Sequence, residues 1–408
     1  MKIGILGANV PLKVLNASLK KFGFEAVFLN HCLVKSYPDE RLKEIAGDLK
    51  EYAREFLNKN SCPRTNDFEY KIRLKKIIEK QGFSGLVFNA IKFCDFQHFD
   101  YRYFKENLTI PTLIVEHELD ANSEGQIMTR LDAFFESIKG KVKVEVKAKV
   151  KAGKYFVGID SGSHATKLVC IDADKNVVAR KIVPTGTSVK KSVEKALRDL
   201  ADAGIKKGQI AAIVATGYGR NNVDCAGGII TEISCHAAGA FHILGKPATV
   251  IDIGGQDSKA IRIGDGGNVA QFAMNDKCAA GTGRFLEVMA DKLEMGIGEF
   301  AELALKANRA VPVSSMCSVF AESEVISLIA SGSSKEEIAK GIHMAIAERT
   351  ASLARRINGT PPYYMAGGVA KNKCLVAEIQ KCLGSEIFVI DEPQFTGALG
   401  AALFALKG

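Results

Sequence analysis

The sequence of 408 residues contains no tryptophan, no long apolar run and no Cys-x-x-Cys pair. The absence of tryptophan excludes nothing. Because a membrane-spanning helix needs roughly 18 or more consecutive apolar residues, the absence of such a run argues against one. No cleavable signal pattern is recognisable at the N-terminus. We therefore expect a large soluble protein of the cytoplasm with no membrane partner.

The ten cysteines are spread over the chain and do not form the dense framework of a disulfide scaffold. In a cytoplasmic protein they indicate reduced thiols or metal ligands. At this length we expect two or three domains.

The formal net charge of +9 is concentrated in one short segment. Residues 139–154 hold seven lysines and one glutamate, without interleaved aromatic residues. Such a stretch is typical of a solvated linker and gives little support for nucleic-acid binding. We interpret it as a basic linker between a module of residues 1–138 and a domain of residues 155–408.

Residues 1–138 alternate apolar runs with amphipathic stretches, which predicts a Rossmann-like or flavodoxin-like α/β module. No Gly-x-Gly-x-x-Gly follows the first apolar run, so nothing favours dinucleotide binding. The segments expected to be strands are Lys2–Leu6, Ala26–Leu29, Gly85–Asn89 and Thr112–Val115, and those expected to be helices are Leu42–Leu57, Tyr70–Lys80 and Gly125–Ile138.

Two glycine-rich hairpins follow the linker. In each, an apolar strand ends at an aspartate, Asp160 or Asp252, before a tight turn and a returning strand. The turn's N–H groups can wrap a phosphate, and the aspartate can hold the water shell of Mg²⁺. Two copies indicate an internal duplication with a nucleotide clasped between the halves.

A third strand followed by a glycine turn, at Gly367 and Gly368, lets backbone approach a flat ring. This order of motifs is typical of the actin, hexokinase and Hsp70 ATPase fold, and predicts that ATP and Mg²⁺ bind. The catalytic candidates are Asp160, Asp252 and Gln256. The nucleotide-binding candidates are Gly158, Ser161, Gly162, Ser163, Thr166, Lys167, Gly254, Gly255, Asp257, Gly367, Gly368 and Lys371.

Glu232 and His236 are four residues apart, so on one helix they would share a face. They could form a metal pair, a polar pair facing the cleft, or a plain ion pair.

Cys278 and Cys317 each precede a segment with helical periodicity, Gly283–Leu293 and Ser318–Ile329. A helix N-terminus lowers the pKa of a thiol, which favours thiolates at both positions. Two thiolates are too few for an iron–sulfur cluster, which needs four ligands, but a two-fold dimer would supply four. The alternative is that both are small buried apolar residues.

Residues 155–408 resemble the activators of 2-hydroxyacyl-CoA dehydratases and the related BadF/BadG/BcrA/BcrD ATPases. The motifs that carry the resemblance are Gly158–Ser163, Asp252–Asp257, Asn275–Gly283, Ser314–Cys317, Ala366–Asn372 and Pro393–Ala402. The resemblance implies a homodimer with one [4Fe–4S] cluster held by Cys278 and Cys317 of both chains. It also implies that ATP drives the delivery of a low-potential electron to a partner iron–sulfur dehydratase or reductase. A ferredoxin-type or flavodoxin-type donor would first supply that electron to the activator.

Residues 1–138 resemble the C-terminal part of a 2-hydroxyacyl-CoA dehydratase subunit, through Lys92–Asp95, Ile110–Glu116 and Gly125–Phe134. In that family the cysteine matching Cys94 ligates an iron–sulfur cluster, and Cys32 and Cys62 could supply further ligands. The alternative is three unligated cysteines in a degenerate module. Activators are usually the ATPase domain alone, so this fusion departs from the family. Chains of this layout also resemble methanogenesis marker protein 15.

Two other functions fit the same fold. A small-molecule kinase would have no use for Cys278 or Cys317, and a non-catalytic scaffold would bind ATP without hydrolysing it.

Overall fold

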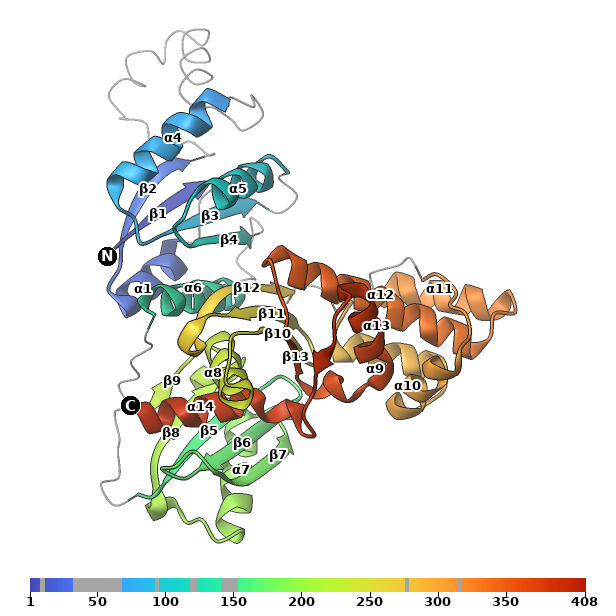
Figure 1. Ribbon diagram of the computed structural model, residues 1–408. Helices are drawn as coiled ribbons and strands as arrows, with labels where there is room; N and C mark the ends of the chain where they lie inside the picture. Colours follow the sequence, from blue (N-terminus) through green and yellow to red (C-terminus); the bar gives the residue numbers. More distant parts are fainter. Residues whose placement is uncertain are drawn as a thin grey trace. The chain divides into compact units, whose positions relative to one another are not determined.

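The computed structural model describes residues 1–7, 12–31, 68–91, 95–117, 124–140, 153–275, 279–313 and 318–408. The chain divides into two compact units, Met1–Lys139 and Gly140–Gly408, which we describe separately (Figure 1). In the part of the chain that the structure describes, no helix is both long and apolar enough to cross a membrane. The expected helix Leu42–Leu57 lies outside the described residues.

The first unit contains a four-stranded parallel sheet of order β2-β1-β3-β4. Every predicted strand is present, and two helices, α1 and α5, appear that the periodicity did not predict. The strands are β1 (Lys2–Gly7), β2 (Glu25–His31), β3 (Gly85–Ile91) and β4 (Thr112–His117), and the helices are α1 (Leu12–Phe22), α4 (Phe68–Gln81), α5 (Asp95–Asn107) and α6 (Glu124–Lys139).

Both faces of this sheet are covered. Leu86 and Phe88 of β3 pack with α4 and α5 on one face, whereas Gly85 lies against Phe134 of α6 on the other. Side chains alternate along a strand, so a sheet buried on both faces needs a nearly continuous apolar run. This explains why the strands of this unit could be found from apolar runs alone.

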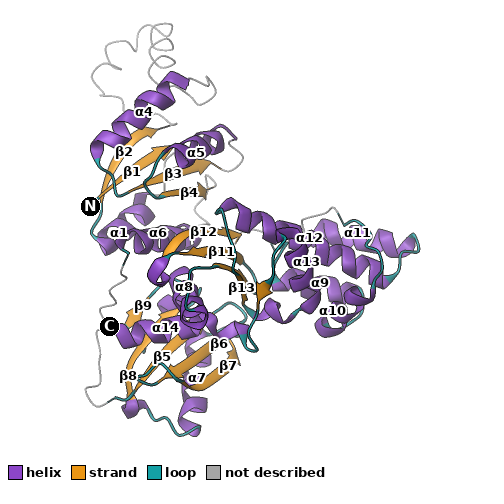
Figure 2. Cartoon of the chain, viewed as in Figure 1, coloured by secondary structure: helices purple, strands orange, loops and turns teal. Residues whose placement is uncertain are grey.

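The second unit contains two five-stranded sheets with the same topology (Figure 2). In each, a central strand pairs antiparallel with the next strand in the sequence and parallel with a later one. This repetition confirms the predicted duplication. The first sheet, in spatial order, is β7 (Val177–Pro184), β6 (Ala165–Ile171), β5 (Tyr155–Ser161), β8 (Ile210–Thr216) and β9 (Gly228–Ile229); the second is β12 (Val269–Asn275), β11 (Ser258–Ile263), β10 (Thr249–Ile253), β13 (Tyr363–Ala366) and β14 (Ile387–Phe388).

Eight helices complete the described part of this unit, with short 3-10 turns at Lys207–Gln209, Arg220–Asn222, Asp265–Gly267, Gly368–Lys371 and Pro393–Phe395. The helices are α7 (Val189–Asp202), α8 (Glu232–Leu244), α9 (Gly283–Lys292), α10 (Ile297–Lys306), α11 (Ser318–Ala330), α12 (Lys335–Arg356), α13 (Lys373–Leu383) and α14 (Thr396–Lys407). Helices α8 and α14 pack against each other between the two sheets (Figure 1). Helix α8 contacts β10, β11 and β12 of the second sheet, and α14 contacts β5, β6 and β8 of the first.

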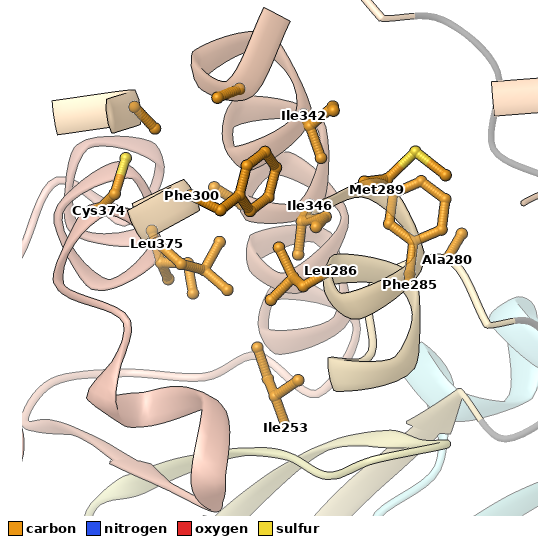
Figure 3. Packing of buried hydrophobic residues seen from close by; sticks show 14 of the residues in the cluster. Ile253, Ala280, Phe285, Leu286, Met289, Phe300, Ile342, Ile346, Cys374 and Leu375 are labelled. Carbon is orange, nitrogen blue, oxygen red and sulfur yellow. The ribbon is translucent and has the colours of Figure 1, made fainter. Parts of the chain in front are cut away.

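The largest apolar cluster joins the second sheet to α9–α13. Figure 3 shows Leu286 and Met289 of α9, Phe300 of α10 and Ile346 of α12 within it. Burying one such side chain contributes about 1.5–3 kcal/mol. Helix α9 is therefore fixed by apolar packing as well as by its connection to the second hairpin.

Candidate active site

The two hairpins place Asp160 and Asp252 in equivalent surroundings. Asp160 pairs in register with Lys167, and Asp252 pairs with Lys259. The distances from the lysine Nζ to the aspartate Oδ2 are 3.1 Å and 3.2 Å. Both aspartates are buried. The duplication thus reproduces a carboxylate–ammonium pair in each sheet.

A glycine with a positive φ lies against each aspartate. Gly217 follows β8 with a φ of 87°, and Gly367 follows β13 with a φ of 83°. A Cβ on Gly217 would be 2.4 Å from Oδ1 of Asp160, and one on Gly367 would be 2.6 Å from Oδ1 of Asp252. Only glycine fits both the backbone conformation and the space. Gly217 is not among the residues predicted for the site, although its position after β8 matches that of Gly367 after β13.

Lys259 lies at the centre of an acidic group. Its Nζ is 2.7 Å from Asp257 Oδ2, 3.2 Å from Asp252 Oδ2 and 3.7 Å from Glu232 Oε1. Burial lowers the pKa of Lys259, but the charges of Asp257, Glu232 and Asp252 outweigh burial and raise it well above its usual value. The Lys259 side chain is only 3% exposed, against 19% for Lys167. Lys167 is therefore the more accessible lysine of the two.

Two of the three acidic residues around Lys259, Asp252 and Glu232, have pKa values shifted in opposite directions. Burial raises the pKa of Asp252, but the charges of His236 and Lys259 and a hydrogen bond from Lys259 bring it below its ordinary value. For Glu232, burial dominates over the charge of Lys259 and raises the pKa to about 7. Asp252 is therefore a permanent anion near neutral pH, whereas Glu232 exchanges a proton there.

Glu232 and His236 both lie on α8, as their spacing predicted, but each has a different partner. Glu232 faces Lys259, and His236 Nε2 is 3.7 Å from Asp252 Oδ2. Within the described ranges, no group of three or more His, Cys, Asp and Glu side chains is arranged to hold a metal ion. Of the three alternatives for Glu232 and His236, a polar pair that faces the cleft fits best, because the two side chains lie against Lys259 and Asp252.

The remaining nucleotide-binding candidates and the catalytic candidate Gln256 fall into two groups. Gly158 and Thr166 serve the scaffold: a Cβ on Gly158 would be 2.0 Å from the Ala398 carbonyl oxygen of α14, and the Thr166 hydroxyl bonds those of Thr185 and Ser192. The others line the hairpin and glycine turns or stand beside them: Ser161, Gly162, Ser163, Gly254, Gly255, Gln256, Gly368 and Lys371, of which Gln256, Gly368 and Lys371 are exposed.

Three buried polar atoms near the aspartates have no hydrogen-bond partner among the described residues. They are Ser161 Oγ, Thr216 Oγ1 and His236 Nδ1. A buried polar atom without a partner is costly in a protein interior. Together with the Asp160 and Asp252 carboxylates and the Lys167 and Lys259 ammonium groups, these atoms could bind a polar ligand that carries its own water shell. This set of groups fits Mg²⁺ and a polyphosphate.

The second hairpin turn is bonded directly to α9. The N–H groups of Gly283 and Arg284 donate to the carbonyl oxygens of Gly254 and Gly255, both at 2.9 Å. A Cβ on Gly283 would be only 3.2 Å from the Gly254 carbonyl oxygen. The first turn of α9 is therefore hydrogen-bonded directly to the turn of the second hairpin.

The cysteines assigned to metal sites, Cys278, Cys317, Cys94, Cys32 and Cys62, lie outside the described residues. The helices predicted after Cys278 and Cys317 are present as α9 and α11. These two helices pack together, and Lys292 Nζ of α9 is 3.0 Å from Glu322 Oε2 of α11. The segments that carry the two cysteines therefore lead into adjoining helices.

The other described cysteines are mostly buried. Cys170, Cys235 and Cys374 are inside the protein, whereas Cys225 is exposed. Burial raises the pKa of Cys170 to about 12, so it remains a thiol. For these three buried cysteines the role of a small apolar residue is sufficient.

The duplicated sheets, the paired hairpins and the glycine turn define an ATPase of the actin and hexokinase type. The chain belongs to the BadF/BadG/BcrA/BcrD ATPase family, whose model matches residues 157–405. This confirms the resemblance drawn from the motifs. Residues 1–138 match the model of the 2-hydroxyglutaryl-CoA dehydratase D-component.

Several named relatives of the second unit are activators of 2-hydroxyacyl-CoA dehydratases. The chain is 48% identical over 256 residues to the activator of lactoyl-CoA dehydratase of Anaerotignum propionicum, covering 62% of this chain and 98% of that protein. It is 45% identical to the (R)-2-hydroxyglutaryl-CoA dehydratase activating ATPase of Acidaminococcus fermentans, covering 62% and 97%. Among solved structures, the activator of 2-hydroxyisocaproyl-CoA dehydratase from Clostridium difficile with bound ADPNP matches with a TM-score of 0.59 at 42% identity, covering 62% and 94%.

Proposed function

We propose that the protein is an ATP-dependent activator that delivers a low-potential electron to a partner iron–sulfur enzyme of the CoA-ester dehydratase or reductase type. The family and the named activators support the activator role. The proposed coupling of ATP hydrolysis to electron transfer is supported by one observation. The first turn of α9 donates two hydrogen bonds to Gly254 and Gly255. They connect the proposed phosphate turn to a helix that begins five residues after Cys278.

ATP is proposed to bind between the two hairpins, with Mg²⁺ held through its water shell by Asp160 and Asp252. Lys167 contacts a phosphate, and the Gly367–Gly368 turn lies beside adenine. Gln256 is exposed in the second turn, where its amide can orient a water. Such sites act chiefly through positioning and charge stabilisation.

The backbone on either side of residue 278 is anchored. Asn275 Nδ2 donates to the Ala280 carbonyl at 3.1 Å, and Thr282 donates to the Ala279 carbonyl through both its N–H and its hydroxyl, at 3.0 Å and 2.6 Å. In this proposal, a displacement of the second hairpin turn is passed through the hydrogen bonds of Asn275, Ala279, Ala280 and Thr282 toward Cys278. ATP and ADP can shift the equilibrium between two conformations of this region only if they make different contacts with it.

The proposed cluster ligands are Cys278 and Cys317 of two chains. Each chain supplies two soft thiolates, and each cysteine precedes one of two adjoining helices in the sequence. This donor set fits half of a [4Fe–4S] site. Bound there, the cluster would supply one-electron reduction at low potential. A homodimer is then required for four ligands, and a ferredoxin-type or flavodoxin-type protein would supply the electron in the cytoplasm.

The first unit, proposed as residues 1–138 joined by the linker 139–154, shows no phosphate hairpin among the residues that the structure describes. We propose that it is a docking or accessory element and not a second ATPase, because its family match is to a dehydratase component.

Phosphate release and visible absorption, measured anaerobically on the same samples, test the function. We expect Cys278→Ser to lose the absorption of an iron–sulfur protein and to keep ATP hydrolysis. The matched control is Cys225→Ser, at an exposed cysteine between β8 and β9, which should keep both. Transfer of phosphate to a small molecule would instead indicate a kinase, and ATP binding without phosphate release would indicate a scaffold.

A further inference from the structure

We propose that His343 is a positioning residue that holds the turn after β13 in the conformation that receives the base of ATP, an inference that rests on the nucleotide site of the proposed function. In that site the base lies beside Gly367 and Gly368. His343 lies on α12 and acts on the turn through Asn372, the residue that ends the turn and caps α13.

His343 is a polar residue inside the largest apolar cluster of the protein. Its side chain is fully buried, and its ring centroid lies 4.8 Å from that of Phe300. Ile342 and Ile346 of the same helix belong to this cluster. A polar group in such surroundings is costly unless its polar atoms find partners. Packing alone therefore does not account for a histidine at this position.

Both ring nitrogens of His343 have partners, and one of these partners lies outside α12. Nδ1–H donates to the Ala339 carbonyl oxygen of the preceding helical turn at 2.7 Å. Nε2 accepts a hydrogen bond from Asn372 Nδ2 at 2.9 Å. Burial lowers the pKa of His343 to about 4, so the ring is neutral near neutral pH and Nε2 remains an acceptor. The histidine thus presents one fixed acceptor to Asn372.

Asn372 connects this acceptor to the backbone of two segments. Its Oδ1 accepts from Leu375 N at 3.0 Å and so caps α13. Its N–H donates to the Val369 carbonyl oxygen at 2.9 Å and closes the 3-10 turn Gly368–Lys371. Because the cap uses Oδ1, the orientation of the amide is fixed and Nδ2 is left for His343. The bond to His343 therefore holds the residue on which the turn ends.

The turn held in this way borders both the aspartate site and α9. Gly367, directly before the turn, lies against Asp252, and a Cβ on Gly367 would be 2.6 Å from Oδ1 of Asp252. A Cβ on Gly283, in the first turn of α9, would be 3.2 Å from Val369 Cγ2. Gly368 is exposed, and a Cβ on it meets nothing within 4 Å. A shift of the turn would therefore change the space left for the base as well as the contact with α9.

The test compares the ATP affinities of variants at both ends of the bond, measured by calorimetry on the full-length protein. Asn372→Ser keeps a good N-cap, but its shorter side chain carries no amide for His343. His343→Leu fills the cluster but offers no acceptor. We expect each change to weaken ATP binding roughly tenfold, because each leaves a buried polar atom unpaired at the end of the turn.

A conservative replacement separates the hydrogen bond from the volume of the ring. His343→Gln should restore most of the affinity lost in His343→Leu, because the amide oxygen of glutamine can accept the hydrogen bond from Asn372. The double variant with His343→Leu and Asn372→Ser should bind ATP no more weakly than either single variant, because both changes break the same contact.

Ile346→Val is the matched control. Ile346 lies one turn further along α12 in the same apolar cluster. The loss of one methyl group there should lower the melting temperature, and the affinity for ATP should stay at the wild-type value.

Folded Asn372→Ser and His343→Leu proteins that bind ATP as tightly as wild type would overturn the proposal. Additive losses in the double variant, or an equal loss in Ile346→Val, would overturn it as well, because the effect would then come from general destabilisation. If the wild type binds ATP with this dependence on His343 but donates no electron, the activator function fails while the role of His343 stands.

Discussion

His164 Nε2 lies 3.5 Å from Glu287 Oε2 and so joins the turn of the first hairpin to α9. The His164 ring also lies against Gly255 of the second hairpin, where a Cβ would be 2.9 Å from Nδ1. Arg284 Nη1 approaches the same Glu287 oxygen at 3.3 Å. One histidine therefore contacts both proposed phosphate turns and the helix that follows Cys278.

We predict that His164→Ala weakens the coupling of ATP to α9 and leaves the fold intact. Both partners of the ion pair are partly exposed, so its contribution to stability is about 0–1 kcal/mol. Hydrogen exchange of the α9 amides with and without ATP should show a smaller difference in His164→Ala and Glu287→Gln than in wild type. Equal ATP-dependent protection in all three proteins would remove this contact from the coupling.

Replacing Asp160 or Asp252 by Asn should lower ATP hydrolysis by roughly 10²-fold or more, because each carboxylate is proposed to position Mg²⁺. Asn keeps the side-chain volume, so folding is less affected than by Ala. Asp265→Asn, at an exposed turn residue, is the control. Unchanged turnover in both site variants would show that Mg²⁺ is held elsewhere.

Gly368→Val should weaken ATP binding without harming the protein. A Cβ on Gly368 meets nothing within 4 Å, so the valine clashes only with a bound ring. Gly367→Val should behave differently, because its Cβ would be 2.4 Å from the Ile253 carbonyl oxygen at a positive φ, and we expect it to lower the melting temperature. If calorimetry on folded Gly368→Val gives wild-type affinity, adenine lies away from this turn.

His343 makes stability depend on pH. Its side chain is fully buried, and burial lowers its pKa from 6.5 to about 4. Nδ1–H donates to the Ala339 carbonyl and Nε2 accepts from Asn372 Nδ2, so a second proton has no acceptor. The unfolded chain binds that proton first; stability is therefore full above pH 6.5 and is lost as the pH falls toward 4.

Between pH 7 and pH 5 this one group should remove about 2 kcal/mol from the free energy of unfolding. Urea unfolding of the wild type and of His343→Gln at both pH values measures it. The variant should show a correspondingly smaller loss, and an identical loss in both proteins would assign the pH dependence to other groups.

The sequence predicted the hairpins, their aspartates and the helices after Cys278 and Cys317, because these features depend on local patterns. Helix α5 was missed because its aromatic residues have modest helix propensity, and packing of Phe104 against Phe88 stabilises it instead. The hydroxyl partners of Thr166 lie on later segments, so its scaffold role was not visible. The special protonation of Glu232 likewise arises from residues of other elements. Local patterns therefore identified the site, and tertiary contacts determine what each residue does there.

The most direct test of the account is the amount of iron and sulfide per chain after anaerobic purification, for wild type and Cys317→Ser. One [4Fe–4S] cluster shared by two chains predicts about two irons and two sulfides per chain. Cys317→Ser should lose both while keeping ATP binding, and should weaken the dimer, because metal binding across an interface contributes to association. Wild-type protein without iron, or a Cys317→Ser variant that keeps about two irons per chain, would contradict the shared cluster.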